Sequence, residues 1–211
     1  MSQLTMYQIF GLRKVMKMES LTQWLNNLPE LNHVEKIIAT HYQGRLLENI
    51  DAWNEQELSL NFIGPIFASI DFTVLNQINW FAQRPISSNI GDYLLMGKPD
   101  GIIASGYLAP EKPYFAFQEF KRELDSSGDP IGQNLAAMLI GQEVNDNDQP
   151  IYGCYVVGRN WFFMVLEGKE YAVSRDYSAS GKDIFEIIRI LKALRNNLFA
   201  QNGITVNFEV E

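Results

Sequence analysis

The sequence predicts an α/β fold, in which a central mixed β-sheet is flanked by helices. Two segments with strand character, 101–107 and 114–121, are separated by the turn Ala109–Pro113, which contains two prolines. Proline cannot donate a ladder hydrogen bond, so the three segments together predict a β-hairpin. A predicted helix over 130–144 is followed by the unbroken apolar segment 151–157. A strand that follows a crossover helix runs parallel to the strand before it, so the sheet should be mixed and 151–157 should lie at its centre.

Residues 1–50 are predicted to form a helical extension, and residues 51–211 the main domain, with both parts in one compact unit. Residues 1–18 show no clear periodicity and suggest an arm that docks its apolar side chains on the domain. Ser20 can cap a short helix that ends before Pro29. Residues 32–47 are predicted to be helical because apolar residues recur at helical spacing: Val34, Ile37, Ile38 and Leu46.

The next predicted helix covers residues 54–70, with Asp51 as its expected cap. Its apolar face is formed by Phe62, Ile63, Ile66, Phe67 and Ile70. Glu55 points into this face when the residues are placed at about 100° intervals. Two interpretations stay open for Glu55. It is either an exposed acid favoured by the helix dipole in the first turn, or a carboxylate that reaches the hairpin.

The remaining elements extend the sheet and close the chain. Residues 72–84 are ambiguous between strand and helix, and residues 92–97 are predicted to be the first strand of the sheet. Segments 161–166 and 171–174 continue the sheet as a meander, and 183–198 is a final amphipathic helix. The polar loop RELDSSGDP at 122–130 is a candidate to sit over the end of the hairpin.

Charged residues converge on one end of the predicted hairpin. If it turns near Pro110, the numbers of facing residues sum to about 220, which places Asp100 across from Phe120. Glu119 and Lys121 lie on one face of their strand, and that strand is apolar on both sides. Buried charges are tolerated when they are paired or hold a metal ion, whereas a solvated ion pair is the simpler alternative. The cluster is therefore a candidate functional site.

Pro99-Asp100, then Glu119-Phe120-Lys121 on the next strand, then a helix beginning near Pro130, resembles the PD-(D/E)xK nuclease superfamily, which has the restriction-endonuclease-like fold. The resemblance covers about residues 92–158. It implies that Asp100, Glu119 and the Phe120 carbonyl hold Mg²⁺ or Mn²⁺, and that Lys121 positions or deprotonates the attacking water. The implied reaction is hydrolysis of a phosphodiester bond in nucleic acid, with DNA and RNA both open as substrates.

Two further site residues are implied by the same resemblance. Members of the superfamily often supply an acidic residue from the helix before the sheet, which favours Glu55 as a further metal ligand over Glu48. Some members carry a glutamine on the helix after the hairpin, and Gln133 occupies that place. In those members a tyrosine follows four residues later, whereas this chain has Ala137. A surface role for Gln133 therefore stays open.

The charge balance favours a competing interpretation. The formal net charge is −8, whereas proteins that bind nucleic acid usually present a basic face. A local basic surface could come from Lys112, Arg122, Arg159 and Lys169. The alternative is a non-catalytic interaction or assembly domain on the same fold, which forms a homo-oligomer or binds another protein.

Other classes of site and location are disfavoured. The chain has two histidines, His33 and His41, and one cysteine, Cys154, so Ser–His–Asp, Cys–His and thiolate–zinc sites are nearly excluded. No apolar run approaches the roughly 20 residues that a membrane span requires, so no membrane partner is expected. The N-terminus lacks a signal-peptide pattern, and a single cysteine in an apolar strand is typical of a reducing compartment. We therefore expect a cytoplasmic protein.

Overall fold

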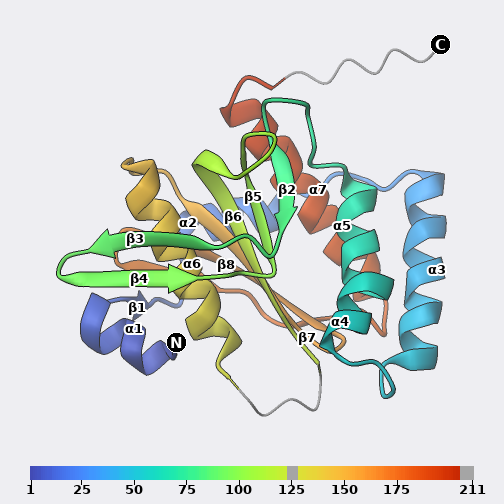
Figure 1. The fold of residues 1–211 in the computed structure, drawn as a ribbon. Helices are drawn as coiled ribbons and strands as arrows, with labels where there is room; N and C mark the ends of the chain where they lie inside the picture. The colour runs from blue at the N-terminus through green and yellow to red at the C-terminus, as the bar shows by residue number, and fades with distance from the viewer. Residues whose placement is uncertain (123–127, 205–211) are drawn as a thin grey trace.

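The computed structural model describes residues 1–122 and 128–204 (Figure 1). Within these ranges, eight strands form one mixed sheet in the order β1-β9-β8-β7-β6-β5-β2, with β10 also pairing with β8. The strands are β1 Arg13–Lys14, β2 Asn79–Ala82, β5 Gly101–Ser105, β6 Glu111–Lys121, β7 Ile151–Val157, β8 Asn160–Glu167, β9 Glu170–Val173 and β10 Tyr177–Ser178. The predicted α/β class and mixed sheet are confirmed. Residues 123–127, in the loop proposed to sit over the hairpin end, fall outside the described ranges.

Helices cover both faces of the sheet, and a separate hydrophobic core lies on each face. One face is covered by α2 Glu19–Asn26, α3 His33–Asn49, α4 Glu55–Leu58, the π-helical segment η1 Ser59–Ile63, α5 Gly64–Ile70 and α7 Asp183–Gln201. The other is covered by α1 Gln3–Phe10, α6 Pro130–Asn145 and a two-stranded ribbon, β3 Ile86–Ile90 with β4 Tyr93–Gly97 (Figure 1). No helix in the described ranges combines the length and the apolar character needed to cross a bilayer.

The central hairpin is confirmed, with a register one residue from the prediction. Gly101 pairs with Gln118, and the antiparallel ladder is interrupted by a bulge near Ala104. Continuing that register places Asp100 across from Glu119 rather than Phe120. Strand β7 runs parallel to β6, as the crossover rule requires, and Lys121 pairs with Val157 at the ends of the two strands. Strand β6 is buried from Phe115 to Phe120 because it has a core on each side.

Two segments differ from their predictions. Residues 1–18 are not simply an arm, since they form helix α1 and strand β1, and β1 pairs with β9 at the edge of the main sheet. Strand 92–97 exists as β4, but it pairs with β3 in the separate ribbon instead of joining the sheet. Alternation explains this placement, because only Leu95 of β4 is buried while Leu94 and Met96 are exposed. A strand with one apolar face suits a ribbon that lies on α6.

The predicted helix over 54–70 is present but is built differently at two points. Asn54, not Asp51, caps it, through a capping box in which Asn54 and Glu57 bond to each other's backbone N–H groups. Within the helix, the Gly64 N–H donates to the Ser59 carbonyl in a π-turn. Pro65 follows at once, and since proline has no N–H and clashes with a normal helical turn, the wider turn accommodates it. Glu55 therefore stands in the first turn of a helix that is anchored against the sheet.

Other helix boundaries follow the sequence closely. Helices α3, α6 and α7 cover the predicted segments, and Asp129 caps α6 with Pro130 in its first turn. Helix α2 starts two residues earlier than predicted and has Met18, not Ser20, at its N-cap position. Residues 72–84 contain the short strand β2, which occupies the opposite edge of the sheet from β1.

Candidate active site

Asp100, Glu119 and Lys121 meet where the β5–β6 hairpin ends. Asp100 directly precedes β5, and its Oδ2 accepts a hydrogen bond of 2.7 Å from the Phe120 N–H. The Lys121 ammonium lies 3.1 Å from Glu119 Oε1. Residues two apart on a strand point to the same face, so the strand geometry itself holds this pair together.

Glu55 joins the cluster from the N-terminus of α4. Its Oε2 lies 3.3 Å from the Lys121 ammonium, so its carboxylate faces the hairpin. The contact is with Lys121, which therefore sits between two carboxylates. Glu48, the other acidic candidate, is exposed on α3. Assignment of Glu55 as a metal ligand stays a prediction.

Burial controls the electrostatics of the cluster. The side chains of Glu119 and Lys121 are 10% and 14% exposed, against 40% for Glu55. Burial, reinforced by the Asp100 carboxylate, raises the pKa of Glu119 to about 7, and Lys121 only partly opposes this. Burial also raises the pKa of Asp100, although the Phe120 N–H and Lys121 both oppose the shift. Both carboxyl groups are thus destabilised as anions.

Lys121 behaves in the opposite way. Burial alone would lower the pKa of its ammonium, but the carboxylates of Glu119 and Glu55 outweigh burial and raise it. Lys121 is therefore a charged hydrogen-bond donor in this arrangement. It can orient a water molecule or stabilise negative charge, whereas acting as a base would require the loss of its proton.

Gln133 lies close to Lys121, as expected from its position in the first turn of α6. A β-carbon placed on Gly128 would lie 3.4 Å from Gln133 Oε1 and 3.9 Å from Lys121 Cε. Gly128 thus occupies the space between the two side chains. The Oε1 atom is buried, and none of the described residues donates a hydrogen bond to it. A buried acceptor without a partner has free capacity for a ligand or water.

Two residues that the sequence did not single out also shape the site. Gln83 donates its backbone N–H to the Asp100 carbonyl at 3.0 Å and so holds the backbone of Asp100 beside the end of β2. It follows β2 within the segment whose structure was ambiguous, so no sequence pattern indicated it. Gly101 is also required, because a β-carbon there would collide with Gln118 and Trp80, whose side chains hydrogen bond at 3.1 Å.

The basic residues proposed for a nucleic-acid surface are divided between the two ends of the sheet, so the four do not form one local surface. Lys112 is near the start of β6 and Lys169 is in the β8–β9 turn, both at the end of the sheet away from Lys121. Arg122 and Arg159 lie at the same end as Lys121, and Arg159 is 3.8 Å from Asp51. The length of β6 accounts for this separation, because Lys112 lies near its start and Arg122 directly follows its end.

The donor set suits a hard divalent cation. Among residues 1–122 and 128–204, no three or more histidine, cysteine, aspartate or glutamate side chains are arranged to hold a metal ion. Asp100 and Glu119 nevertheless form a largely buried pair of carboxyls, in which the Asp100 carboxylate raises the pKa of Glu119, and a cation would relieve that cost. Mg²⁺ characteristically uses one or two carboxylates and keeps several waters. The types of donor at this site therefore fit such an ion, and the assignment of Asp100, Glu119 and the Phe120 carbonyl as its ligands stays a prediction.

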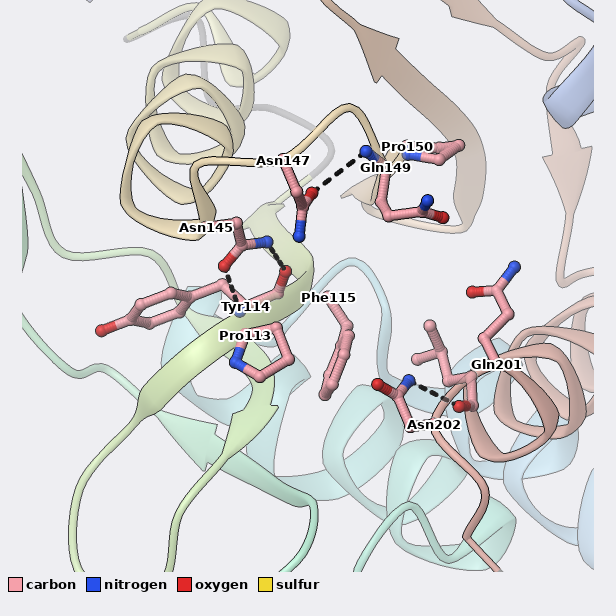
Figure 2. Close-up of a pocket in the computed structure, with 10 residues that line it drawn as sticks. Pro113, Tyr114, Phe115, Asn145, Asn147, Gln149, Pro150, Gln201 and Asn202 are labelled. Atoms are coloured by element: carbon pink, nitrogen blue, oxygen red, sulfur yellow. Dashed lines mark hydrogen bonds between the residues drawn. The ribbon is translucent and has the colours of Figure 1, made fainter.

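A separate pocket lies near the other end of β6 (Figure 2). It has a volume of about 360 Å³ and is lined by neutral side chains: Pro113, Tyr114, Phe115, Asn145, Asn147, Gln149, Pro150, Leu198, Gln201 and Asn202. Asn145 is committed to structure, since it accepts from the Tyr114 N–H and donates to the Tyr114 carbonyl, both at 2.7 Å. The lining includes no carboxylate or cation, so this pocket is not the candidate active site.

The histidines and the cysteine lie apart from the cluster. His33 and His41 are exposed on α3, and Cys154 is buried in β7, where burial raises the pKa of its thiol. A buried thiol with a raised pKa is a poor nucleophile. Chemistry at the site therefore depends on its carboxylates, its ammonium and its amides.

The chain matches no protein-family model, and a search of curated proteins found no match. Any assignment of function consequently depends on the hairpin motif and its geometry.

Proposed function

We propose that this chain is a metal-dependent nuclease of the PD-(D/E)xK type, with a restriction-endonuclease-like core, that hydrolyses phosphodiester bonds of nucleic acid. The observation that carries the proposal is the convergence of Asp100, Glu119 and Lys121 in a mostly buried cluster at one hairpin end. The order of elements supports it, since the hairpin is followed by α6 and then by the parallel strand β7.

In this proposal, Asp100, Glu119 and the Phe120 carbonyl hold Mg²⁺ or Mn²⁺. Such an ion supplies Lewis-acid stabilisation of the phosphate and lowers the pKa of a bound water. Phe120 already directs its N–H toward Asp100, and in an antiparallel pairing the N–H and C=O of one residue face the same neighbour. The three oxygen donors therefore come from adjacent positions on one edge of the hairpin.

Lys121 and Gln133 would orient the reactants. Contacts with Glu119 and Glu55 restrain the Lys121 ammonium, which can then donate to the attacking water or to a phosphate oxygen. The unpartnered Oε1 of Gln133 can accept a hydrogen bond from that water. Holding the water and the phosphate in a reactive geometry lowers the activation barrier of such reactions by several kcal/mol, as an order of magnitude.

The first prediction tests this site with matched substitutions. Asp100→Asn and Lys121→Ala should each lower Mg²⁺- or Mn²⁺-dependent cleavage by about 100-fold or more, because each removes a group that contacts the reacting centre. The substrates are single- and double-stranded DNA and RNA, incubated with each metal and with EDTA. Glu143→Gln, an exposed change on α6, is the control and should retain activity.

Thermal stability separates a catalytic site from a structural ion pair. Asp100 is destabilised as an anion, so Asp100→Asn should leave the melting temperature unchanged or higher while activity disappears. A large fall in melting temperature would instead show that the carboxylate is a structural partner.

The acidic character of the chain favours one competing function. A net charge of −8 weakens attraction to nucleic acid and suits an interaction or assembly domain. If the purified protein neither binds Mn²⁺ nor cleaves any of the four substrates, the interaction domain becomes the better conclusion.

A further inference from the structure

An open groove crosses the outward side of α5, between α3 and β2 (Figure 1). Its volume is about 760 Å³, which is in the range of pockets that hold small organic groups. The side chains that line it are uncharged, and the largest are Tyr42 from α3, Leu60 from η1 and Trp80 from β2. Leu60 is 66% exposed, so a ligand can reach the groove from solvent.

The groove shares two of its elements with the candidate site. Glu55 begins α4, and Ser59, which lines the groove, follows about one helical turn later. Ala82, which also lines the groove, pairs with Gly101, and Gly101 directly follows Asp100. A nucleic-acid strand whose cleaved bond lies at Asp100 would therefore pass this groove within a few nucleotides.

Trp80 presents a fixed aromatic ring to the groove. Its indole N–H donates to Gln118 Oε1 at 3.1 Å, and its ring stacks on Phe67 with centroids 5.2 Å apart and planes at 13°. A ring that is already held loses little side-chain entropy when a ligand binds. Aromatic side chains stack on nucleobases of any sequence, because every base has a π-face.

Strand β2 also offers backbone hydrogen-bonding groups beside the groove. The Gln83 N–H points toward β5, and directions alternate along an antiparallel strand, so Trp80 and Ala82 point their N–H and C=O groups away from β5. No strand in the described ranges pairs with β2 on this side. A donor and an acceptor on one edge match the hydrogen-bonding edge of an unpaired base.

The free part of this edge is too short for a protein strand. At one end Ile78 exchanges backbone hydrogen bonds with Val74, at 2.9 and 3.1 Å, so a turn covers the edge. At the other end β2 stops at Ala82. A peptide, or β2 of a second copy, would thus find two residues to pair with, whereas strands typically have about 5 to 6. A base needs only a donor and an acceptor.

Cations near the groove suit a negatively charged backbone. Arg84 and Lys98 are exposed and lie close in sequence to the paired ends of β2 and β5. Arg45 is exposed on α3, about one turn from Tyr42. These cations can contact phosphates while the uncharged groove holds a base. Because the net charge is −8, stacking would also supply affinity that electrostatic attraction does not.

We propose that this groove binds an unpaired nucleobase close to the cleaved bond, which makes single-stranded nucleic acid the preferred substrate class. This inference rests on the proposed function. In a duplex the bases are paired and stacked, so a base could enter the groove only after it left the stack, at a cost in free energy. DNA and RNA both offer such a base.

Two substitutions change the groove and leave the site residues intact. Ala68→Phe adds a ring from an exposed position on α5 and so fills the groove without altering the core. Ala200→Phe makes the same change at an exposed position on α7 and is its control. Tyr42→Leu keeps an apolar wall but removes the ring, whereas its control Tyr42→Phe keeps the ring. Melting temperatures show that each variant is folded.

Binding is measured by the fluorescence anisotropy of labelled single strands and matching duplexes, in EDTA and again in Ca²⁺, which takes oxygen ligands as Mg²⁺ does. The wild type should bind single strands more tightly than duplexes. Ala68→Phe and Tyr42→Leu should each weaken single-strand binding by about 10-fold, as the loss of one base–aromatic stack would. The slope of log K against log salt should stay unchanged, because no cation is removed. Both controls should bind like the wild type.

A change in the ligand tests the same contact. Single strands that each lack one base, with the gap moved along the strand, should bind about 10-fold more weakly when the missing base is the one in the groove. That gap and Ala68→Phe remove the same contact, so together they should weaken binding no more than either change alone.

The outcomes distinguish this inference from the proposed function. If the wild type cleaves nucleic acid, but Ala68→Phe and Tyr42→Leu bind single strands within twofold of it, the base groove is overturned and the nuclease proposal stands. If both variants bind weakly and no substrate is cleaved, the groove is supported and the nuclease proposal fails. If the wild type binds no single strand, the base groove is overturned. It is also overturned if the wild type sediments as a dimer and Ala68→Phe as a monomer, since the groove is then a protein interface.

Discussion

At Glu119, burial and a neighbouring carboxylate act in the same direction. Both favour the protonated form, and the contact with Lys121 offsets them only in part, so the pKa rises from its ordinary value of 4.5 to about 7. An acid whose pKa is raised by folding stabilises the native state only while it stays protonated. Near neutral pH, Glu119 thus contributes a cost that a bound cation could relieve.

The second prediction follows from the sign of this shift. Below pH 4.5 Glu119 is protonated in both states, and between about pH 4.5 and 7 the unfolded chain loses its proton more readily, so stability falls as pH rises. Urea unfolding in EDTA should show this cost almost fully at pH 8, where a shift from 4.5 to about 7 amounts to about 3 kcal/mol. Glu119→Gln should therefore gain stability relative to the wild type between pH 5 and pH 8. A difference that does not change with pH would contradict the raised pKa.

The charged residues of the site could be predicted from the sequence, but the residues that hold them in place could not. Asp100, Glu119 and Lys121 belong to a short motif on a hairpin that the apolar pattern indicates. Gln83 lies in a segment where neither helical nor strand periodicity dominates, and its contact with Asp100 depends on the turn after β2. Backbone contacts between distant segments have no sequence period, so they emerge only from the fold.

Among the elements, α1 and α6 are joined by a single carboxylate. Asp129 Oδ1 accepts from the Gly132 N–H at 2.9 Å, which caps α6, and Oδ2 accepts from the Gln3 N–H at 2.6 Å, in the first turn of α1. The α6 cap has a local sequence signal, since an aspartate directly before a proline is typical of a helix start. The bond to Gln3 spans 126 positions and has no local signal.

The third prediction concerns this double cap. Asp129→Ala should destabilise the fold by about 2.5 to 4 kcal/mol, because a cap contributes about 1 kcal/mol and a hydrogen bond to a charged group about 1.5 to 3. Asp129→Asn keeps the α6 cap and should cost less. Asn32→Ala, which removes the capping box of α3 alone, is the control at about 1 kcal/mol. Equal losses for Asp129→Ala and Asn32→Ala in urea unfolding would show that the bond to Gln3 contributes nothing.

Elements with two buried faces were predicted more reliably than elements with one. Strands β6 and β7 carry long apolar runs because a core lies on each side of them. The sequence predicted the strand β4 but not the strand with which it pairs. Its single buried residue, Leu95, fits an edge strand of the sheet and a separate ribbon equally well. The first residue of a helix was predicted wrongly where several polar residues could serve as its N-cap, as with Asp51 and Asn54.

On the scale of the whole molecule, charge is unevenly placed. The chain carries a net charge of −8, yet several exposed cations lie near the candidate site. Arg84 follows Gln83, Lys98 lies two residues before Asp100, and Arg122 follows Lys121, and all three are exposed. Lys112 lies near the opposite end of β6. Under the proposed function, these cations would supply the positive charge that attracts a negatively charged backbone to this end, where the carboxylates of the site also lie.

The fourth prediction tests whether that local charge, rather than the net charge, governs substrate binding. Arg84→Ala and Lys98→Ala should each raise KM for nucleic acid by about 3- to 10-fold with little change in kcat, because phosphate contacts add binding without acting on the reacting bond. The salt dependence of binding should weaken, with the slope of log K against log salt falling by about 0.7 to 0.9 per cation removed. Lys112→Ala makes the same change in net charge at the far end, so it should leave both quantities unaltered. If Lys112→Ala weakens binding as much as Arg84→Ala, then net charge controls the interaction and the site end is not the contact surface.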